Sequence, residues 1–251
     1  MYVLTITSQK GGVGKTTTAH AIGAGLSLKG YRVLLIDLDD QCNLSTLMRA
    51  DKNKPTALDV LQNPKTITEA IQHTEQGNII ASSRALAGAD NIITATGKEY
   101  RLREALEICN NNYDYCVIDT PPHLGILIVN ALTASNGAII PAKADLFSLQ
   151  GIYQLQDTIE AVKKYCNPEL EILGIVLTIY KQITIINREL AEVIDQTAKD
   201  FNTKTFNTKI RDCTAIQEAQ YSHTDIYSYA PRSNATADYT ALLAEIFGEE
   251  I

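Results

Sequence analysis

The chain has 251 residues, of which 45% are hydrophobic and 20% are charged, a composition that excludes disordered and fibrous proteins. No apolar run approaches the roughly 20 residues that a membrane span needs, and the five cysteines contain no C-x-x-C pair, which argues against zinc or a disulfide framework. The net charge is −7, and from residue 150 onward 15 acidic residues outnumber 9 basic ones, which argues against a broad basic face for nucleic acid.

Strand-like apolar runs alternate with helix-like stretches along the chain. This alternation predicts an α/β fold with a doubly wound, mostly parallel sheet of about seven to eight strands flanked by helices. Expected strands are 2–7, 33–37, 78–82, 115–119, 137–141, 171–178 and 203–206. Expected helices are 16–28, 44–49, 56–62, 66–73, 98–111, 124–134, 149–166, 184–200 and 236–247. Because no linker, repeat or low-complexity tract interrupts them, we expect a single domain over 1–251.

The loop after the first expected strand is rich in glycine and reads Lys10-Gly11-Gly12-Val13-Gly14-Lys15-Thr16-Thr17. Gly14, Lys15 and Thr16 match the end of the phosphate-binding pattern G-x-x-x-x-G-K-[ST]. Backbone N–H groups of such a loop, together with the following helix N-terminus, hold the phosphates. Lys15 is placed to reach the β- and γ-phosphates, Thr16 to bind Mg²⁺ and Thr17 to contact the α-phosphate. The loop therefore predicts a triphosphate and Mg²⁺ as ligands, and it carries an additional cation, Lys10.

Two later strands end in carboxylates. The second expected strand runs into Asp37 and Asp39, and the fourth ends at Asp119. Ligands of open parallel sheets bind at the carboxyl ends of strands, so these groups are candidates for the metal and the attacking water. The alternative for Asp37 or Asp39 alone is a cap of the helix that follows the strand.

The second lysine gives the loop a resemblance to the deviant Walker A motif, KGGxGKT, of the ParA/MinD family of ATPases. The run 37–43 resembles the family's D-x-D-P-Q-G-N motif, with departures at Asp40 and Cys42. The run 119–122 matches its D-T-P-P motif. The chain is thus similar to a ParA-type, signature-lysine P-loop ATPase.

The resemblance implies a catalytic set of Lys10, Lys15 and Asp39. Asp39 would hold the hydrolytic water and, with Thr16 and Asp119, would serve the metal. Lys10 would reach the nucleotide of a second subunit, which couples ATP to homodimer formation. The family also implies slow hydrolysis, a ParB-like activator and a role in plasmid or chromosome partitioning.

Other family features are matched less completely. The strand ending at Thr178 resembles one whose end lies near the adenine ring, and 145–151 resembles a stretch at a dimer-facing helix. The arginines that hold nonspecific DNA in the family are displaced here: Asp212 and Ala215 occupy their positions. A displaced patch could be formed by Arg211, Lys209, Lys204 and Lys181, but scattered solvated cations are an equal alternative.

The last segment has apolar residues at helical spacing over 239–247 and ends in acidic residues, so we expect it to pack on the domain rather than insert into anionic lipid. Met1 leads directly into the first strand without a signal peptide. We therefore expect a cytoplasmic protein without stable membrane insertion, and the family resemblance implies association with the nucleoid.

Three alternatives stay open. The first is a related ATPase that positions a protein or membrane cargo without binding DNA. The second is an iron–sulfur electron-transfer ATPase, which needs cysteines just after the D-T-P-P motif, whereas Cys116 precedes it and Cys166 lies far beyond. The third is a domain that binds nucleotide without turnover.

Overall fold

The strands of the chain assemble into one sheet. The computed structural model describes residues 1–181 and 185–248. Its strands are β1 (Tyr2–Ile6), β2 (Val33–Asp37), β3 (Ile71–Thr74), β4 (Gly77–Ile80), β5 (Tyr115–Asp119), β6 (Gly137–Ala142), β7 (Glu171–Tyr180) and β8 (Thr205–Arg211). Their order across the sheet is β3-β4-β2-β5-β1-β6-β7-β8, and each neighbouring pair except β3–β4 is parallel. The expected α/β architecture with a mostly parallel sheet is confirmed.

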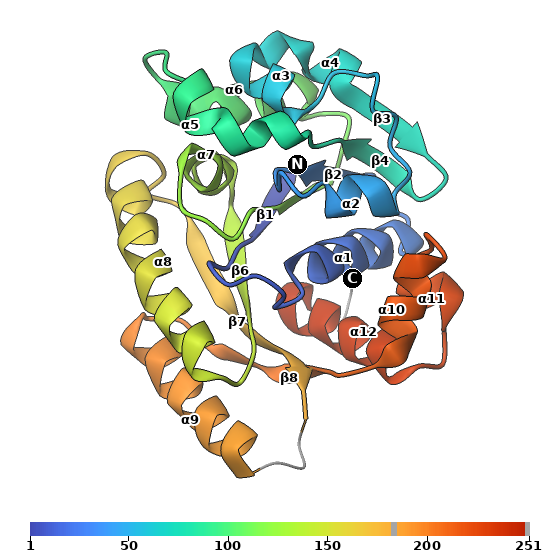
Figure 1. The fold of residues 1–251 in the computed structure, drawn as a ribbon, viewed down its shortest axis with the longest axis vertical. Coiled ribbons are helices and arrows are strands. Elements are labelled where there is room, and N and C mark those ends of the chain that lie inside the picture. Colours follow the sequence, from blue (N-terminus) through green and yellow to red (C-terminus); the bar gives the residue numbers. More distant parts are fainter. Residues whose placement is uncertain (182–184, 249–251) are drawn as a thin grey trace.

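Helices cover both faces of this sheet (Figure 1). In the described residues they are α1 (Lys15–Leu28), α2 (Asn43–Leu47), α3 (Ala57–Gln62), α4 (Ile67–Ala70), α5 (Ala89–Ile92), α6 (Arg101–Cys109), α7 (Ile126–Ala134), α8 (Leu146–Tyr165), α9 (Ile185–Asp200), α10 (Thr214–Tyr221), α11 (Ile226–Tyr229) and α12 (Asn234–Phe247). Short 3₁₀ turns are η1 (Pro64–Thr66), η2 (Arg84–Gly88) and η3 (Lys98–Tyr100). Helices α1 and α10–α12 lie on one side of the sheet, and α7–α9 lie on the other (Figure 1).

Alternate residues of each central strand enter different hydrophobic cores. Leu34 and Ile36 of β2 pack with α3, α6 and α7, whereas Val33 and Leu35 pack with α1 and α12. Successive strand side chains point to opposite faces, so a sheet covered on both sides needs apolar residues at every position. This explains why the central strands read as continuous apolar runs.

The carboxyl ends of three adjacent strands meet at one edge of the sheet. Ile6 of β1 lies opposite Asp119 of β5, which in turn lies opposite Asp37 of β2. In the sheet, β5 and β2 lie on one side of β1, and β6 lies on the other side. Such a reversal of strand order opens a crevice above the sheet, and the glycine-rich loop begins there.

The helix expected over 66–73 is wrong in its second half. The chain forms η1 and α4 and then enters β3, which pairs antiparallel with β4 across a two-residue turn. The turn is closed by Gly77, whose φ of 119° suits glycine. Pairing with a neighbouring strand overrides the local helical pattern here.

The region after residue 203 also differs from expectation. The expected strand 203–206 is observed as the longer β8, an edge strand whose exposed polar residues hide the usual apolar pattern. Helices α10 and α11, and the short η2 and α5, were not expected. The expected helix 184–200 is observed as α9 from Ile185, and residue 184 lies outside the described residues.

The last helix, α12, packs on the domain as expected. Tyr239, Leu242 and Leu243 are buried, and a Cβ on Gly25 of α1 would lie only 2.3 Å from Leu243 Cδ1. The terminal acidic residues 249–250 lie outside the described residues. Across 1–181 and 185–248, no helix combines the length and apolar character needed to cross a bilayer.

Candidate functional site

The loop between β1 and α1 borders a cavity of about 600 Å³. Gly12 and Gly14 have φ values of 70° and 81°, in the left-handed region that glycine adopts at little cost. Gly14 is the N-cap of α1, and no side chain caps this helix end. Backbone N–H groups of the first turn and the positive end of the helix dipole therefore remain for an anion. The cavity volume is in the range of small-molecule sites.

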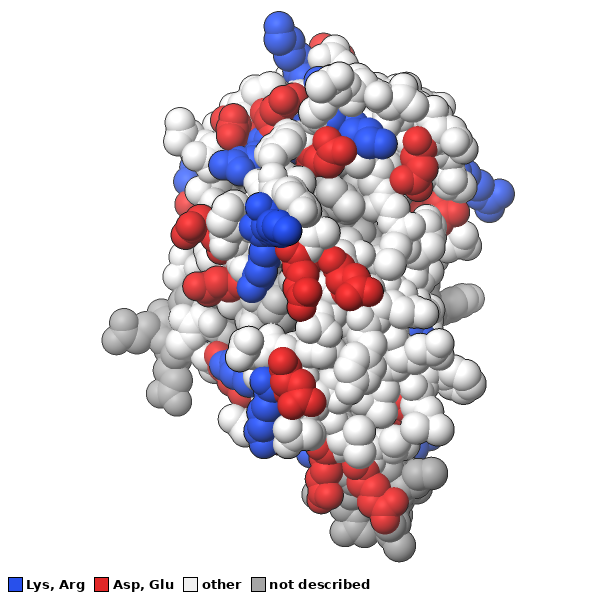
Figure 2. Space-filling model, turned by 90° about the vertical axis from the view of Figure 1, so that its left-hand side faces the viewer, with Lys and Arg blue, Asp and Glu red and all other residues white. Residues whose placement is uncertain are grey.

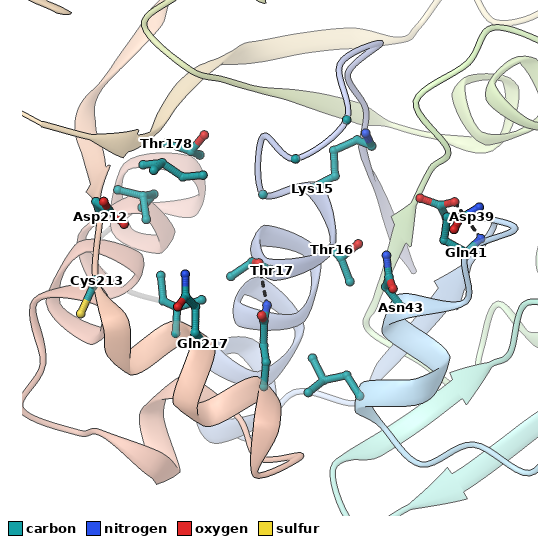
Figure 3. A pocket seen from close by; sticks show the side chains of 18 of the residues that line it. Lys15, Thr16, Thr17, Asp39, Gln41, Asn43, Thr178, Asp212, Cys213 and Gln217 are labelled. Carbon is teal, nitrogen blue, oxygen red and sulfur yellow. Dashed lines mark hydrogen bonds between the residues drawn. The ribbon is translucent and has the colours of Figure 1, made fainter.

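Side chains enter the cavity from three directions (Figure 3). Lys15, Thr16 and Thr17 lie in its centre at the start of α1. On one side are Asp39, Gln41 and Asn43, which follow β2. On the other side are Thr178 from β7 and the residues Asp212, Cys213 and Gln217 around the start of α10.

Lys15 is almost fully buried, with 6% of its surface exposed. Its Nζ donates a hydrogen bond to the carbonyl oxygen of Lys10 at 3.1 Å. Burial lowers the pKa of Lys15, and the nearby carboxylates Asp119 and Asp39 act in the opposite direction. A buried cation at a helix N-terminus is an unfavourable arrangement unless an anion joins it. The arrangement therefore favours a phosphate ligand.

Lys10 has a different environment. Its Nζ contacts both carboxylate oxygens of Asp145, at 2.5 and 2.6 Å, and lies 5.2 Å from the centre of the Phe147 ring. Asp145 is also the N-cap of α8, where it accepts the N–H of Ser148 at 2.8 Å. The side chain of Lys10 thus pairs within its own chain, while the neighbouring Gly11 lines the cavity.

Asp119 has the properties of a metal-binding carboxylate. It is completely buried, and neither of its carboxylate oxygens has a hydrogen-bond partner in the described part of the chain. Burial raises its pKa well above the ordinary range and Asp37 adds to this, whereas Thr16 and Lys15 act in the opposite direction. An unpaired buried carboxylate is costly, and a divalent cation would remove that cost.

The donor set suits Mg²⁺ in particular. Among the described residues no group of three or more His, Cys, Asp or Glu side chains could enclose a metal. Mg²⁺ is commonly held by one or two carboxylates together with waters and substrate phosphates, without a protein cage. Asp119, with the adjacent Thr16 hydroxyl and Asp39, fits this pattern.

Asp39 and Asp37 have separate positions although they are two residues apart. Asp39 lines the cavity and accepts the N–H of Gln41 at 3.0 Å, and burial raises its pKa. Asp37 lies beneath the loop, where it accepts the N–H and the hydroxyl of Ser45 in α2. Burial raises the pKa of Asp37 to about 6. Asp37 therefore anchors α2, as the capping alternative indicated, and Asp39 faces the ligand space.

Two threonines of the cavity form hydrogen bonds that were not predicted from the sequence. Thr17 Oγ accepts a hydrogen bond from the Gln220 side chain of α10 at 2.9 Å. The Thr178 hydroxyl is within hydrogen-bond distance of the carbonyls of Val13 and Ala142, at 2.7 and 3.2 Å. Thr178 thus contacts the phosphate loop itself, in addition to lining the cavity; its contact with adenine stays a prediction.

The four cations considered as a displaced DNA patch each have a partner. Arg211 pairs with Asp238, and Lys181 pairs with Asp212. Lys209 and Lys204 lie over the rings of Tyr180 and Phe206. On the side of the molecule shown in Figure 2, acidic and basic side chains are interspersed. The two ion pairs lower the positive charge that Arg211 and Lys181 offer to the phosphate groups of DNA.

One wall of the cavity was not predicted from the sequence. It is formed by Asp212, Cys213, Ile216, Gln217 and Gln220. These residues follow β8 and begin α10, an element without a clear apolar period. Their position after the last strand of the sheet, at its carboxyl edge, was the available signal. The cysteine that precedes the D-T-P-P motif, Cys116, does not reach this wall, because it is fully buried within β5.

Comparisons with known proteins find relatives that match nearly the whole chain. A family model described as an AAA domain matches residues 1–172. The sporulation initiation inhibitor protein Soj of Bacillus subtilis is 36% identical over 249 residues, which cover 97% of each chain. The chromosome partitioning protein ParA of Caulobacter vibrioides is 36% identical over 255 residues, which cover 99% of this chain and 94% of that protein.

Solved structures are also similar over nearly the whole chain. Cobyrinic acid a,c-diamide synthase from Mycobacterium smegmatis, with bound ADP and magnesium, is 30% identical with a TM-score of 0.83, covering 97% of this chain and 92% of that chain. A putative plasmid partition protein from Borrelia burgdorferi bound to AMPPNP has a TM-score of 0.83 at 23% identity, covering 100% and 99% of the two chains, and it shares the fold.

Proposed function

Because the chain belongs to the ParA/Soj family of partitioning ATPases, we propose that residues 1–251 form a single Mg²⁺-dependent ATPase domain that acts as a dimerising switch. The observation that carries this proposal is Lys15, buried between the glycine-rich loop and the carboxylates Asp39 and Asp119. This arrangement combines a cation for phosphate with unpaired carboxylate oxygens for a metal.

The loop and α1 would bind the triphosphate. N–H groups after Gly11 would contact the phosphate oxygens, Lys15 would neutralise charge on the β- and γ-phosphates, and Thr17 would donate to the α-phosphate. Thr16, Asp39 and Asp119 would hold Mg²⁺, which supplies charge stabilisation to the transferred phosphoryl group. Thr178 would lie beside the adenine.

Hydrolysis requires a positioned water. Asp39 lines the cavity next to Lys15, and it would orient the attacking water through its carboxylate. Lys15 would stabilise the charge that develops on the phosphoryl oxygens, the kind of contact whose loss costs roughly 10²–10³ in kcat. Lys10 would add a second positive charge from the partner subunit of the homodimer.

The test is phosphate release from ATP in the presence of Mg²⁺ and of a ParB-like activator. We expect slow release by the protein alone, faster release with the activator, and rates lowered by roughly 10²–10³ in Lys15→Ala and in Asp39→Ala. An Asp39→Ala protein that still dimerises with ATP would place Asp39 in hydrolysis rather than in binding. Absence of phosphate release from the parent protein under all these conditions would support nucleotide binding without turnover.

The cargo of the switch has two candidates. Partitioning of DNA, with ATP-dependent association with nonspecific DNA, follows from the family. The paired state of Arg211 and Lys181, and the acidic C-terminal half, favour the alternative, a protein or membrane cargo without DNA. Binding of nonspecific DNA with ATP, measured from 50 to 300 mM salt, separates them, because DNA binding weakens steeply with salt.

A further inference from the structure

A closed ring of hydrogen bonds lies beneath the loop that carries Asp39. Asp37 Oδ2 accepts the N–H and the hydroxyl of Ser45, at 2.8 and 2.7 Å, and Asp37 Oδ1 accepts the N–H of Asp39 at 3.0 Å. Ser82, two residues beyond the end of β4, completes the ring. Its N–H donates to Ser45 Oγ at 2.8 Å, and its hydroxyl donates to the carbonyl oxygen of Asp39 at 2.6 Å.

All four members of this ring are buried. Their exposed fractions are 0% for Asp37, 6% for Asp39, 7% for Ser45 and 8% for Ser82. Hydrogen bonds are stronger in such surroundings, and a polar group left without its partner there is costly. The ring therefore fixes the main chain of Asp39 more firmly than the same bonds would at the surface.

Ser82 acts at a distance from the cavity. It is not among the cavity-lining residues, whereas Asp39 is. Its hydroxyl is directed at the main-chain carbonyl of Asp39. Any effect of Ser82 on chemistry must therefore pass through Asp39.

We propose that Ser82 is a positioning residue for hydrolysis, whose hydroxyl holds the Asp39 main chain so that the Asp39 carboxylate faces the ligand before nucleotide binds. The proposal rests on the proposed function, because it assigns the attacking water to Asp39. It adds a residue that follows β4 to the catalytic arrangement and assigns Ser45 and Asp37 to the support of the same loop.

The neighbouring serines 82 and 83 offer a matched pair of variants. Ser82→Ala removes the hydroxyl that contacts Asp39, and Ser83→Ala removes a hydroxyl that has no role in the ring. Ser82→Cys keeps a similar shape but supplies a weaker donor. The measurements are the single-turnover rate of phosphate release, ATP affinity and thermal unfolding.

We expect Ser82→Ala to lower the turnover rate about tenfold, the equivalent of one hydrogen bond, with ATP affinity changed less than about twofold. Ser82→Cys should fall between Ser82→Ala and the parent, and Ser83→Ala should match the parent. In an Asp39→Ala background, Ser82→Ala should cause no further loss of rate, because its effect passes through Asp39.

Three results would overturn the proposal. Ser82→Ala could turn over like the parent, it could lose rate and affinity equally, or it could lower the residual rate of Asp39→Ala. Each of these leaves the proposed function intact as long as the parent releases phosphate. A parent that releases none overturns both, so the two failures are distinguishable. If Ser82→Ala does not fold, the comparison of Ser82→Cys with the parent decides.

Discussion

The ammonium group of Lys10 contacts both carboxylate oxygens of Asp145 in the same chain, although 135 residues separate them. In the proposed homodimer the same ammonium group reaches the partner's nucleotide. The intramolecular ion pair therefore competes with dimer formation. This competition leads to the first prediction.

Asp145→Asn should strengthen ATP-dependent dimerisation. Asparagine still caps α8 by accepting the N–H of Ser148, but it removes the charge that holds Lys10. Because the pair is partly exposed, its contribution is up to about 1 kcal/mol. Formation of one homodimer breaks two such pairs, so the dimer dissociation constant should fall by up to roughly 30-fold. Analytical ultracentrifugation measures this.

The control for this variant is Asp157→Asn, which removes one charge from an exposed position on the same helix. It should dimerise like the parent. Weaker dimerisation of Asp145→Asn than of Asp157→Asn would contradict the competition between the two states of Lys10.

Gln220→Leu should weaken nucleotide binding through Thr17. The Gln220 amide donates to Thr17 Oγ at 2.9 Å, which leaves the hydroxyl hydrogen of Thr17 for a phosphate oxygen. Loss of one such bond corresponds to roughly a three- to tenfold weaker affinity. Calorimetric titration should show similar losses for ADP and ATP, since both carry the α-phosphate.

A double-mutant cycle with Thr17→Val checks the route of this effect. If Gln220 acts through Thr17, the double variant should bind nucleotide no more weakly than Thr17→Val alone. Additive losses would show that Gln220 contributes independently, by its own contact with the nucleotide.

Asp119→Asn should abolish the part of nucleotide stabilisation that depends on Mg²⁺. In the parent, ATP with Mg²⁺ should raise the unfolding temperature more than ATP with a chelator, because ligand binding stabilises the folded state by mass action. In the variant the two conditions should give equal unfolding temperatures. A Mg²⁺-dependent shift that survives in Asp119→Asn would place the metal on other residues.

Asp114→Asn should destabilise the protein at neutral pH and have a smaller effect in acid. The Arg32 guanidinium lowers the pKa of Asp114 from 3.8 to about 2. A carboxylate whose pKa is lower in the folded state stabilises folding above its unfolded pKa, and this contribution is lost as pH falls through the folded pKa. Urea unfolding of the variant and the parent should therefore converge between about pH 4 and pH 2. A difference that is constant from pH 7 to pH 2 would contradict the assignment.

The local parts of the site were predictable from sequence. Gly14, Lys15 and Thr16 lie in one contiguous motif. Asp119 ends an apolar strand and Asp39 lies two residues beyond another, so a parallel sheet alone places both carboxylates at the edge where the motif begins. Gly14, Lys15, Thr16 and Asp39 line the cavity at the start of α1, and Asp119 is buried where it interacts with Thr16 and Lys15.

The remaining relationships depend on strand order and on distant pairing. Ser82 reaches Asp39 only because β4 is the neighbour of β2, and the apolar pattern does not specify that order. Five strands, β2 to β6, separate Lys10 from its partner Asp145 along the chain. The residues of β3 have a helical pattern in sequence, but in the structure they pair with β4 as a hairpin. These features come from tertiary packing rather than from local propensity.

In the proposed switch, ATP drives dimerisation through Lys10. The most direct measurement is the mass in solution, by light scattering, of Asp39→Ala and of Asp39→Ala combined with Lys10→Ala, each with ATP and Mg²⁺. We expect Asp39→Ala to shift from the 27.5 kDa of one chain to twice that mass. The double variant should bind ATP and stay monomeric. Nucleotide-saturated Asp39→Ala that remains a monomer, or a double variant that dimerises equally well, would contradict it.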